Sequence, residues 1–163
     1  MRTNEELFLK MALDAWRSQV DRTSKLIDSL TDDDLNREVA PGRNTGTYLV
    51  GHLIAIHDAL FSLMRFGERI YSSYDQIFVD NPDNPKLLKP PTSELRTAWA
   101  VVNEKLDYYF NALSPTEWFE RHAAISETDF EKEPHRNRLN VVLNRTAHLA
   151  NHLGQLTFLK PRG

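Results

Sequence analysis

Apolar residues along most of this chain recur at alternating steps of four and three, the pattern of an amphipathic α-helix. Four long stretches show it, at about 9–30, 44–66, 92–113 and 138–160. The first stripe consists of Leu9, Leu13, Trp16, Val20, Thr23, Ile27 and Leu30. No segment has a convincing strand pattern. We therefore predict an all-α fold, a four-helix bundle with a long crossover loop and a short extra helix.

The second stretch contains a histidine in its apolar stripe. Asn44 or Thr45 can cap this helix, and the predicted core stripe is Thr45, Leu49, His52, Ile56, Ala59, Leu63 and Phe66. The pattern thus places His52 in the core, where unpaired ring nitrogens cost about 1–3 kcal/mol. We expect a partner for it inside the bundle. His57 and Asp58 point away from this face, so neither is expected to share a metal with His52.

The connections carry turn and capping signals. Thr31 followed by Asp34 predicts a short turn to about Arg37, and Ser114 followed by Glu117 predicts a short helix to about His122. The segment 123–137 reads as loop. The connection 67–92 is long enough to cross an end of the bundle and partly cover a site, although a plain crossover fits equally well.

The last helix presents two histidines one turn apart. His148 and His152 lie at i and i+4, so their Cβ atoms are about 5–6 Å apart on one face. Asn144 and Gln155 lie on the same side. Because facing helices of a bundle project side chains inward, His52 can complete a three-histidine metal site. Three neutral imidazoles suit zinc, nickel or ferrous iron, with an open fourth position for water or substrate.

Other interpretations of the histidines remain open. An i, i+4 pair alone occurs by chance on surface helices, and all three rings could instead hold a buried hydrogen-bond network. His57, His122 and His135 read as ordinary surface or loop histidines. The Glu-x-x-His motif of di-iron bundles and the His-Glu-x-x-His motif of zinc proteases do not occur.

Composition limits the remaining classes. A chain of 163 residues with 40% hydrophobic residues fits one domain, 1–163. The absence of cysteine excludes disulfides and thiolate metal sites and is compatible with a cytoplasmic protein. The net charge of -3, without a basic stripe, argues against nucleic-acid binding. No signal-peptide core follows Met1, and no apolar run spans a membrane, so we expect a soluble, cytoplasmic protein.

Two motifs resemble a known family. Asn44-Thr-Gly-Thr-Tyr-Leu-Val-Gly-His52-Leu and His148-Leu-Ala-Asn-His152-Leu-Gly-Gln155-Leu are similar to the DinB-like (DinB/YfiT) superfamily of metalloenzymes in helix order and spacing. The resemblance implies up-down-down-up topology, one divalent ion on His52, His148 and His152, commonly zinc or nickel, and frequently a homodimer. Ile56 stands where many members carry a carboxylate one turn after the first histidine.

The resemblance also implies candidate reactions. Relatives include transferases that use low-molecular-weight thiols and metal-dependent hydrolases, and many have no known activity. Because Leu149, Ala150 and Asn151 separate the histidines, no motif supplies a general base, which favours thiol transfer to a small electrophile over hydrolysis. A non-catalytic metal- or ligand-binding stress protein is the alternative. Asn44, Tyr48 and Gln155 are candidates to orient either kind of ligand.

Overall fold

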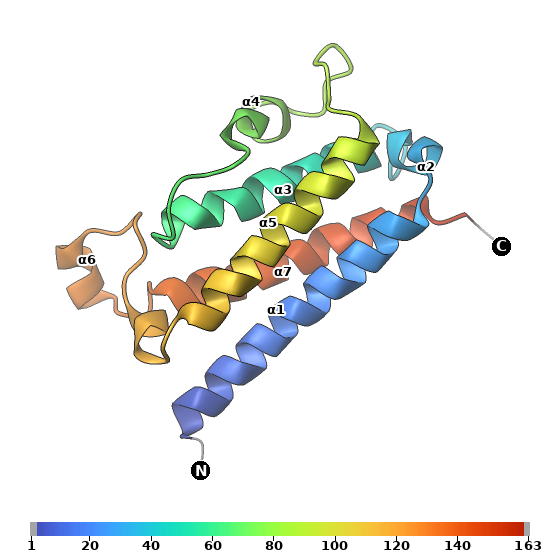
Figure 1. Cartoon of the computed structure of the whole chain (residues 1–163). Helices are drawn as coiled ribbons and strands as arrows, with labels where there is room; N and C mark the ends of the chain where they lie inside the picture. The colour runs from blue at the N-terminus through green and yellow to red at the C-terminus, as the bar shows by residue number, and fades with distance from the viewer. Residues whose placement is uncertain (1–2, 162–163) are drawn as a thin grey trace.

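The prediction of an all-α fold is confirmed by a computed structural model, which describes residues 3–161 (Figure 1). Residues 1–2 and 162–163 lie outside this description. They belong to the predicted domain 1–163, and residues 1–2 also to the N-terminal segment that was searched for a signal peptide. No β-strand occurs within residues 3–161. The α-helices are α1 (Asn4–Ser29), α2 (Asp32–Asn36), α3 (Gly46–Leu63), α4 (Asp75–Phe78), α5 (Thr92–Ala112), α6 (Glu127–Lys132) and α7 (Arg138–Leu156); the 3₁₀ turns are η1 (Ser72–Tyr74), η2 (Thr116–Phe119) and η3 (Thr157–Leu159).

The four long helices α1, α3, α5 and α7 form the body of the molecule. In Figure 1, α1 and α7 lie side by side and run in one direction, while α3 and α5 run in the other. Side-chain bonds agree with this arrangement. The Arg17 guanidinium donates to Asp107 and Arg96 donates to the Ile27 carbonyl, so α1 and α5 are antiparallel.

Local signals fix most helix ends. Thr31 and Asp34 form the predicted capping box of α2, and the Thr45 hydroxyl accepts from the Tyr48 amide at the start of α3. Asn137 caps α7 by accepting from the Asn140 amide. These bonds satisfy amides that a helix start leaves without partners. They hold the two histidine-bearing helices, α3 and α7, at defined starting points.

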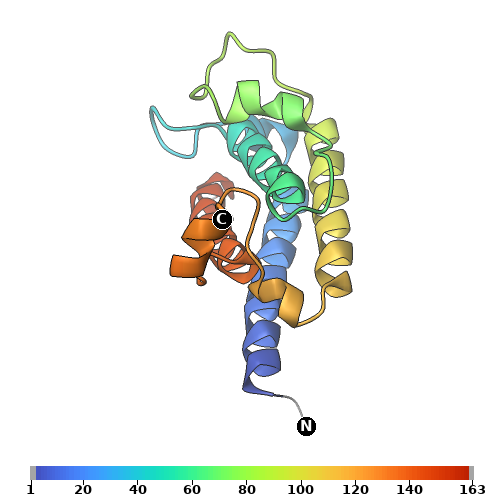
Figure 2. The ribbon, with the colours of Figure 1, turned by 90° about the vertical axis from the view of Figure 1, so that its left-hand side faces the viewer.

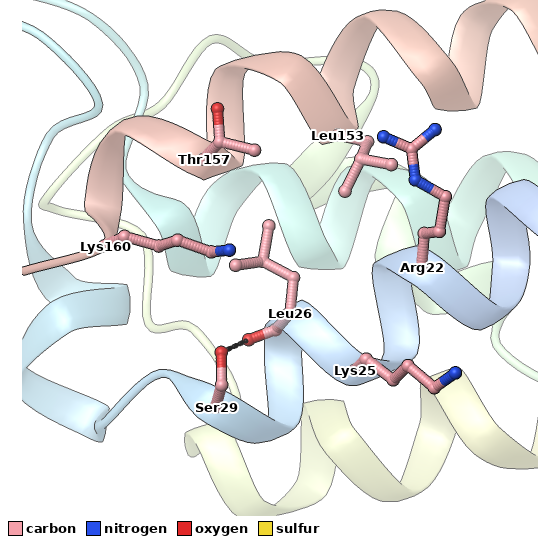
Figure 3. Close-up of a pocket in the computed structure, with 7 residues that line it drawn as sticks. All are labelled: Arg22, Lys25, Leu26, Ser29, Leu153, Thr157 and Lys160. Carbon is pink, nitrogen blue, oxygen red and sulfur yellow. Dashed lines mark hydrogen bonds between the residues drawn. The ribbon is translucent and has the colours of Figure 1, made fainter.

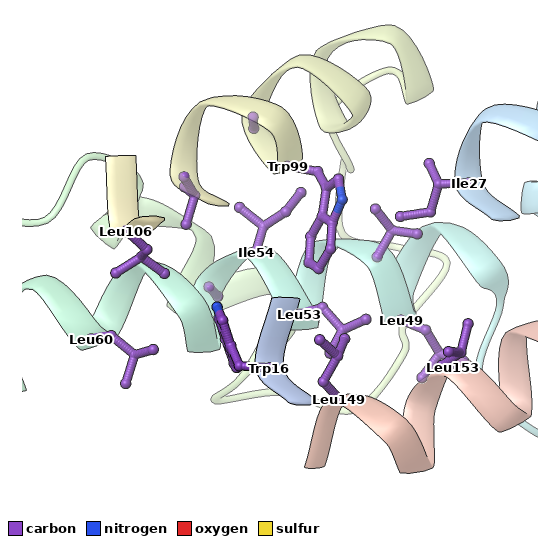
Figure 4. Packing of buried hydrophobic residues seen from close by; sticks show 14 of the residues in the cluster. Trp16, Ile27, Leu49, Leu53, Ile54, Leu60, Trp99, Leu106, Leu149 and Leu153 are labelled. Atoms are coloured by element: carbon purple, nitrogen blue, oxygen red, sulfur yellow. The ribbon is translucent and has the colours of Figure 1, made fainter. Parts of the chain in front are cut away.

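The buried core contradicts the predicted stripe of α3. Leu53, Ile54 and Leu60 are fully buried and pack among residues of the neighbouring helices (Figure 4), whereas of the predicted stripe only Leu49 is buried. His52 is half-buried, so its predicted place in the core was wrong. Because α3 is apolar around nearly its whole circumference, periodicity cannot identify the face that packs most deeply.

One reason for this burial is the connection after α3. Residues 67–91, including η1 and α4, pass over the outer side of α3 (Figure 2). Asp58 accepts hydrogen bonds from the Arg69 guanidinium and from the amides of Ile70 and Tyr71, and Tyr48 Oη donates to the Asn81 carbonyl. These hydrogen bonds hold the connection against much of the length of α3.

Three further predictions required correction. The segment 123–137, read as loop, contains α6, whose start is capped by Ser126 accepting from the Asp129 amide. The predicted short helix at 114–122 is the 3₁₀ turn η2. The last helix ends at Leu156 and continues as η3 to Leu159, short of the predicted end near Lys160.

Within residues 3–161, no helix combines the length and the apolar character required to cross a bilayer.

Candidate metal centre

His52 from α3 and His148 and His152 from α7 converge on one point. Nε2 of His148 lies 3.2 Å from Nε2 of His52 and 3.1 Å from Nε2 of His152. One ligand atom from each residue falls within 4.8 Å of the other two, and all three side chains are half-buried. The structure thus joins a local pair on one helix to a residue 96 positions earlier in the chain.

The partners of the Nδ1 atoms determine which ring nitrogens of His52 and His152 carry a proton. Nδ1 of His52 lies 2.8 Å from the Phe78 carbonyl oxygen, which can only accept, so this Nδ1 carries the proton. Nδ1 of His152 lies 2.8 Å from Oε1 of Gln155 and donates to it. In the neutral rings of His52 and His152, Nε2 is therefore a bare lone pair directed at the centre. This is the usual arrangement of histidines that hold a metal.

Burial and mutual proximity disfavour the charged form of these rings. Burial, together with smaller contributions from nearby His152, His52 and Arg145, lowers the pKa of His148 to about 4. The pKa of His52 is also lowered, chiefly by burial, although its hydrogen bond to Phe78 acts in the opposite direction. Both rings are consequently neutral near pH 7 and available as ligands.

The donor set fits a divalent transition metal. Three imidazole nitrogens are the ligands of open zinc sites, and they also suit nickel and ferrous iron. Within residues 3–161, no carboxylate joins the group. A hydrogen-bond network fits less well, because the two N···N contacts meet at one Nε2 of His148, which has at most one proton to donate.

The predicted orienting residues occupy different environments. Gln155 bonds His152, whereas the Tyr48 ring stacks beside His52 and its hydroxyl bonds the Asn81 carbonyl. Asn44 and Gln155 line one pocket of about 460 Å³, with Val39, Ala40, Gly42, Arg43 and Phe158. Because Gln155 touches both the pocket and His152, the pocket lies beside the histidine group. Asn144 is exposed and bonds Asn140 on its own helix.

His57 was wrongly predicted to be a surface or loop residue. It is fully buried between Trp16 of α1 and Trp99 of α5, with ring centroids 4.7 and 5.1 Å away, and its Nδ1 bonds Asn103. It does not belong to the three-histidine group, as expected from its position on the helix. Asp58, also predicted off the core stripe, is fully buried beneath residues 67–91.

Comparison with known proteins identifies the family. The sequence model of the DinB superfamily matches residues 15–156. The chain belongs to the DinB superfamily. No curated protein matches it.

A solved structure has a similar fold. It is described as the conserved protein of a locus from Enterococcus faecalis and is 15% identical in sequence. The similarity covers 92% of this chain and 93% of that chain, with a TM-score of 0.62. At this level of identity the likeness concerns the fold. Membership of the DinB superfamily and the three-histidine group together fit a metal-binding protein.

Two groups beside the DinB histidines were missed in the sequence. The Phe78 carbonyl is a backbone group, so no residue type in the sequence predicts its hydrogen bond to His52. Arg145 lies three residues before His148, a spacing that places both on one face of α7, and it lowers the pKa values of His52 and His148. That spacing is visible in the sequence.

A separate pocket of about 380 Å³ lies between α1 and the end of α7 (Figure 3). It is lined by Arg22, Lys25, Leu26, Ser29, Leu153, Thr157 and Lys160. None of the three histidines lines it, and the only hydrogen bond among the residues drawn joins Ser29 to the Leu26 carbonyl. This pocket is therefore distinct from the histidine centre.

Proposed function

We propose that this protein is a metalloenzyme that transfers a low-molecular-weight thiol to an electrophilic small molecule. The observation that carries the proposal is the convergence of three Nε2 atoms, two of which are bare because Nδ1 of the same ring donates elsewhere. His52, His148 and His152 hold one divalent ion, zinc or nickel in the first instance and iron as the alternative.

The residues around the centre favour transfer over hydrolysis. A bound divalent ion supplies Lewis acidity, which favours loss of a proton from a thiol without a protein base. Hydrolysis by a zinc protease instead uses a glutamate as general base. Here no carboxylate joins the histidine group within the described residues, and Asp58 is already bonded to Arg69. The thiol proton passes to solvent and the sulfur–carbon bond forms at the electrophile. At a saturated carbon the leaving group departs with the electron pair of the broken bond; at an activated double bond the π bond opens and the neighbouring carbon takes a proton from solvent.

The pocket beside Gln155 supports a small-molecule substrate. Its volume of about 460 Å³ lies within the range of ligand sites, about 300–1,000 Å³. Gln155 lines this pocket and also bonds Nδ1 of His152. It can therefore fix the orientation of that ring and contact a substrate bound in the pocket.

A paired activity screen tests the proposal. Metal-loaded protein is supplied with several thiols and a panel of electrophiles, and in parallel with ester and amide substrates. We expect thiol-dependent conjugation that is lost in His148→Ala/His152→Ala and kept in His135→Ala, an exposed loop histidine. Metal-dependent hydrolysis without conjugation would replace the transferase by the hydrolase. Metal binding without either activity would favour the non-catalytic binder.

A further inference from the structure

Arg145 is a half-buried cation without a counter-charge. It takes part in none of the ion pairs formed within residues 3–161, and its Nε is buried without a hydrogen-bond partner. Arg69, by contrast, is paired with both Asp58 and Asp75. Removing a guanidinium from water without a partner is unfavourable, so an unpaired group of this kind requires an explanation.

The position of Arg145 connects it to the histidine centre. Residues 145, 148 and 152 follow one another at steps of three and four, so their side chains share one face of α7. Arg145 also acts on the centre electrostatically, because its positive charge lowers the pKa values of His52 and His148. Arg145 thus borders the site that the three histidines form.

The charge of the occupied site is strongly positive. Three neutral imidazoles leave the two charges of a divalent ion uncompensated, and Arg145 adds a third. Within residues 3–161, no carboxylate joins the histidine group to offset them. A ligand that carries negative charge is therefore favoured over a neutral one of the same shape, because Coulomb attraction strengthens away from bulk water.

We propose that Arg145 binds a carboxylate of the substrate while another group of that substrate lies at the three-histidine centre. The planar guanidinium matches a carboxylate with two parallel hydrogen bonds. Arg145 and His148 are three positions apart on α7, where Cβ atoms are about 5–6 Å apart, so one small substrate can contact both side chains. This inference rests on the proposed function and narrows it to small anionic substrates, in which either the thiol or the electrophile carries the carboxylate.

Matched probes separate these two sources. Cobalt-loaded protein is titrated with 3-mercaptopropionate and with the neutral 3-mercapto-1-propanol, followed by absorption of the cobalt ion. Zinc-loaded protein is titrated with fumarate and with fumaramide by calorimetry. We expect the anionic member of at least one pair to bind about tenfold or more tightly, since hydrogen bonds to charged groups contribute to this extent. The pair that shows the preference identifies the source.

Variants assign the preference to Arg145. Arg145→Gln and Arg145→Met should abolish it while cobalt and zinc content stay at the wild-type level, and Arg145→Lys should keep part of it. Arg22→Gln serves as the control, because Arg22 is exposed and lines the separate α1–α7 pocket (Figure 3). Thermal melts of each variant establish that it is folded.

The possible outcomes are distinct. Equal affinity for both members of both pairs, or a preference that survives in Arg145→Gln, overturns the inference. If neither thiol changes the cobalt spectrum, the thiol-transfer function fails instead, and the fumarate pair still decides the role of Arg145.

Discussion

At the scale of single residues, His57 is a neutral base enclosed in the core. Burial lowers its pKa to about 3, and the hydrogen bond to Asn103 opposes this shift only in part. Its Nε2 has no hydrogen-bond partner within the described residues. The native state therefore binds its proton far less readily than the unfolded chain, where histidine has a pKa of about 6.5.

This difference predicts acid sensitivity. Above pH 6.5 His57 is unprotonated in both the native and the unfolded protein, so it does not reduce the free energy of unfolding. As the pH falls toward 3, only the unfolded protein gains the proton. The free energy of unfolding should fall by up to about 1.4 kcal/mol per pH unit for this group. In His57→Gln, urea unfolding of chelator-treated protein between pH 7 and 4 should show a smaller slope. An unchanged slope would contradict the assignment.

At the scale of elements, the segment 67–91 positions His52. Its Phe78 ring lies directly against Gly51 of α3, and the Phe78 carbonyl accepts from Nδ1 of His52. The close approach of α4 to α3 therefore depends on a glycine, and it orients a ring of the histidine centre. The plain-crossover interpretation of this connection does not account for that bond.

Gly51→Ala tests this contact. The added Cβ would lie 2.4 Å from the Phe78 ring, so α4 must shift, and we expect a loss of about 1–3 kcal/mol in unfolding free energy together with weaker metal binding. Denaturant melts and metal titration measure both effects.

Gly154→Ala is the matched control. It lies in α7, is exposed and has no atom within 4 Å of an added Cβ, so about 0.5–1 kcal/mol of stabilisation is expected. Equal effects of the two substitutions would show that helix propensity alone explains them.

At the scale of the whole molecule, we expect metal binding at the three histidines to be coupled to folding. His52 and His148 come from helices that are far apart in the sequence and meet only in the folded bundle. An ion that binds the native state and not the unfolded one stabilises it by about 2.7 kcal/mol at 100 times its dissociation constant.

Chelation should therefore lower the melting temperature. We expect about one divalent ion per chain by elemental analysis and a fall of about 5–10 °C in Tm after treatment with a chelator. His148→Ala/His152→Ala should carry no stoichiometric metal and show no response to the chelator, whereas exposed His135→Ala should behave as wild type. Equal, substoichiometric metal in all three proteins would refute the site.

The sequence by itself determined the features that depend on neighbours along the chain. The stripe of the first helix, the Thr31–Asp34 capping box and the placement of His148 and His152 on one face all follow from helix periodicity and backbone bonding within four residues. The sequence also suggested His52 as the third member of the group, from its place in the predicted apolar stripe of a facing helix and from the DinB motifs. Even the missed helix α6 had a local signal, Ser126 followed by Asp129.

Only the tertiary structure decided which faces are covered. α3 is apolar on nearly all sides. Its hydrophobic periodicity therefore does not predict that two tryptophans cover His57 or that residues 67–91 cover Asp58. The bond from His52 to the Phe78 carbonyl and the unpaired charge of Arg145 are likewise set by contacts between distant segments. Burial and pKa depend on what packs against a side chain, and a helical pattern does not contain that information.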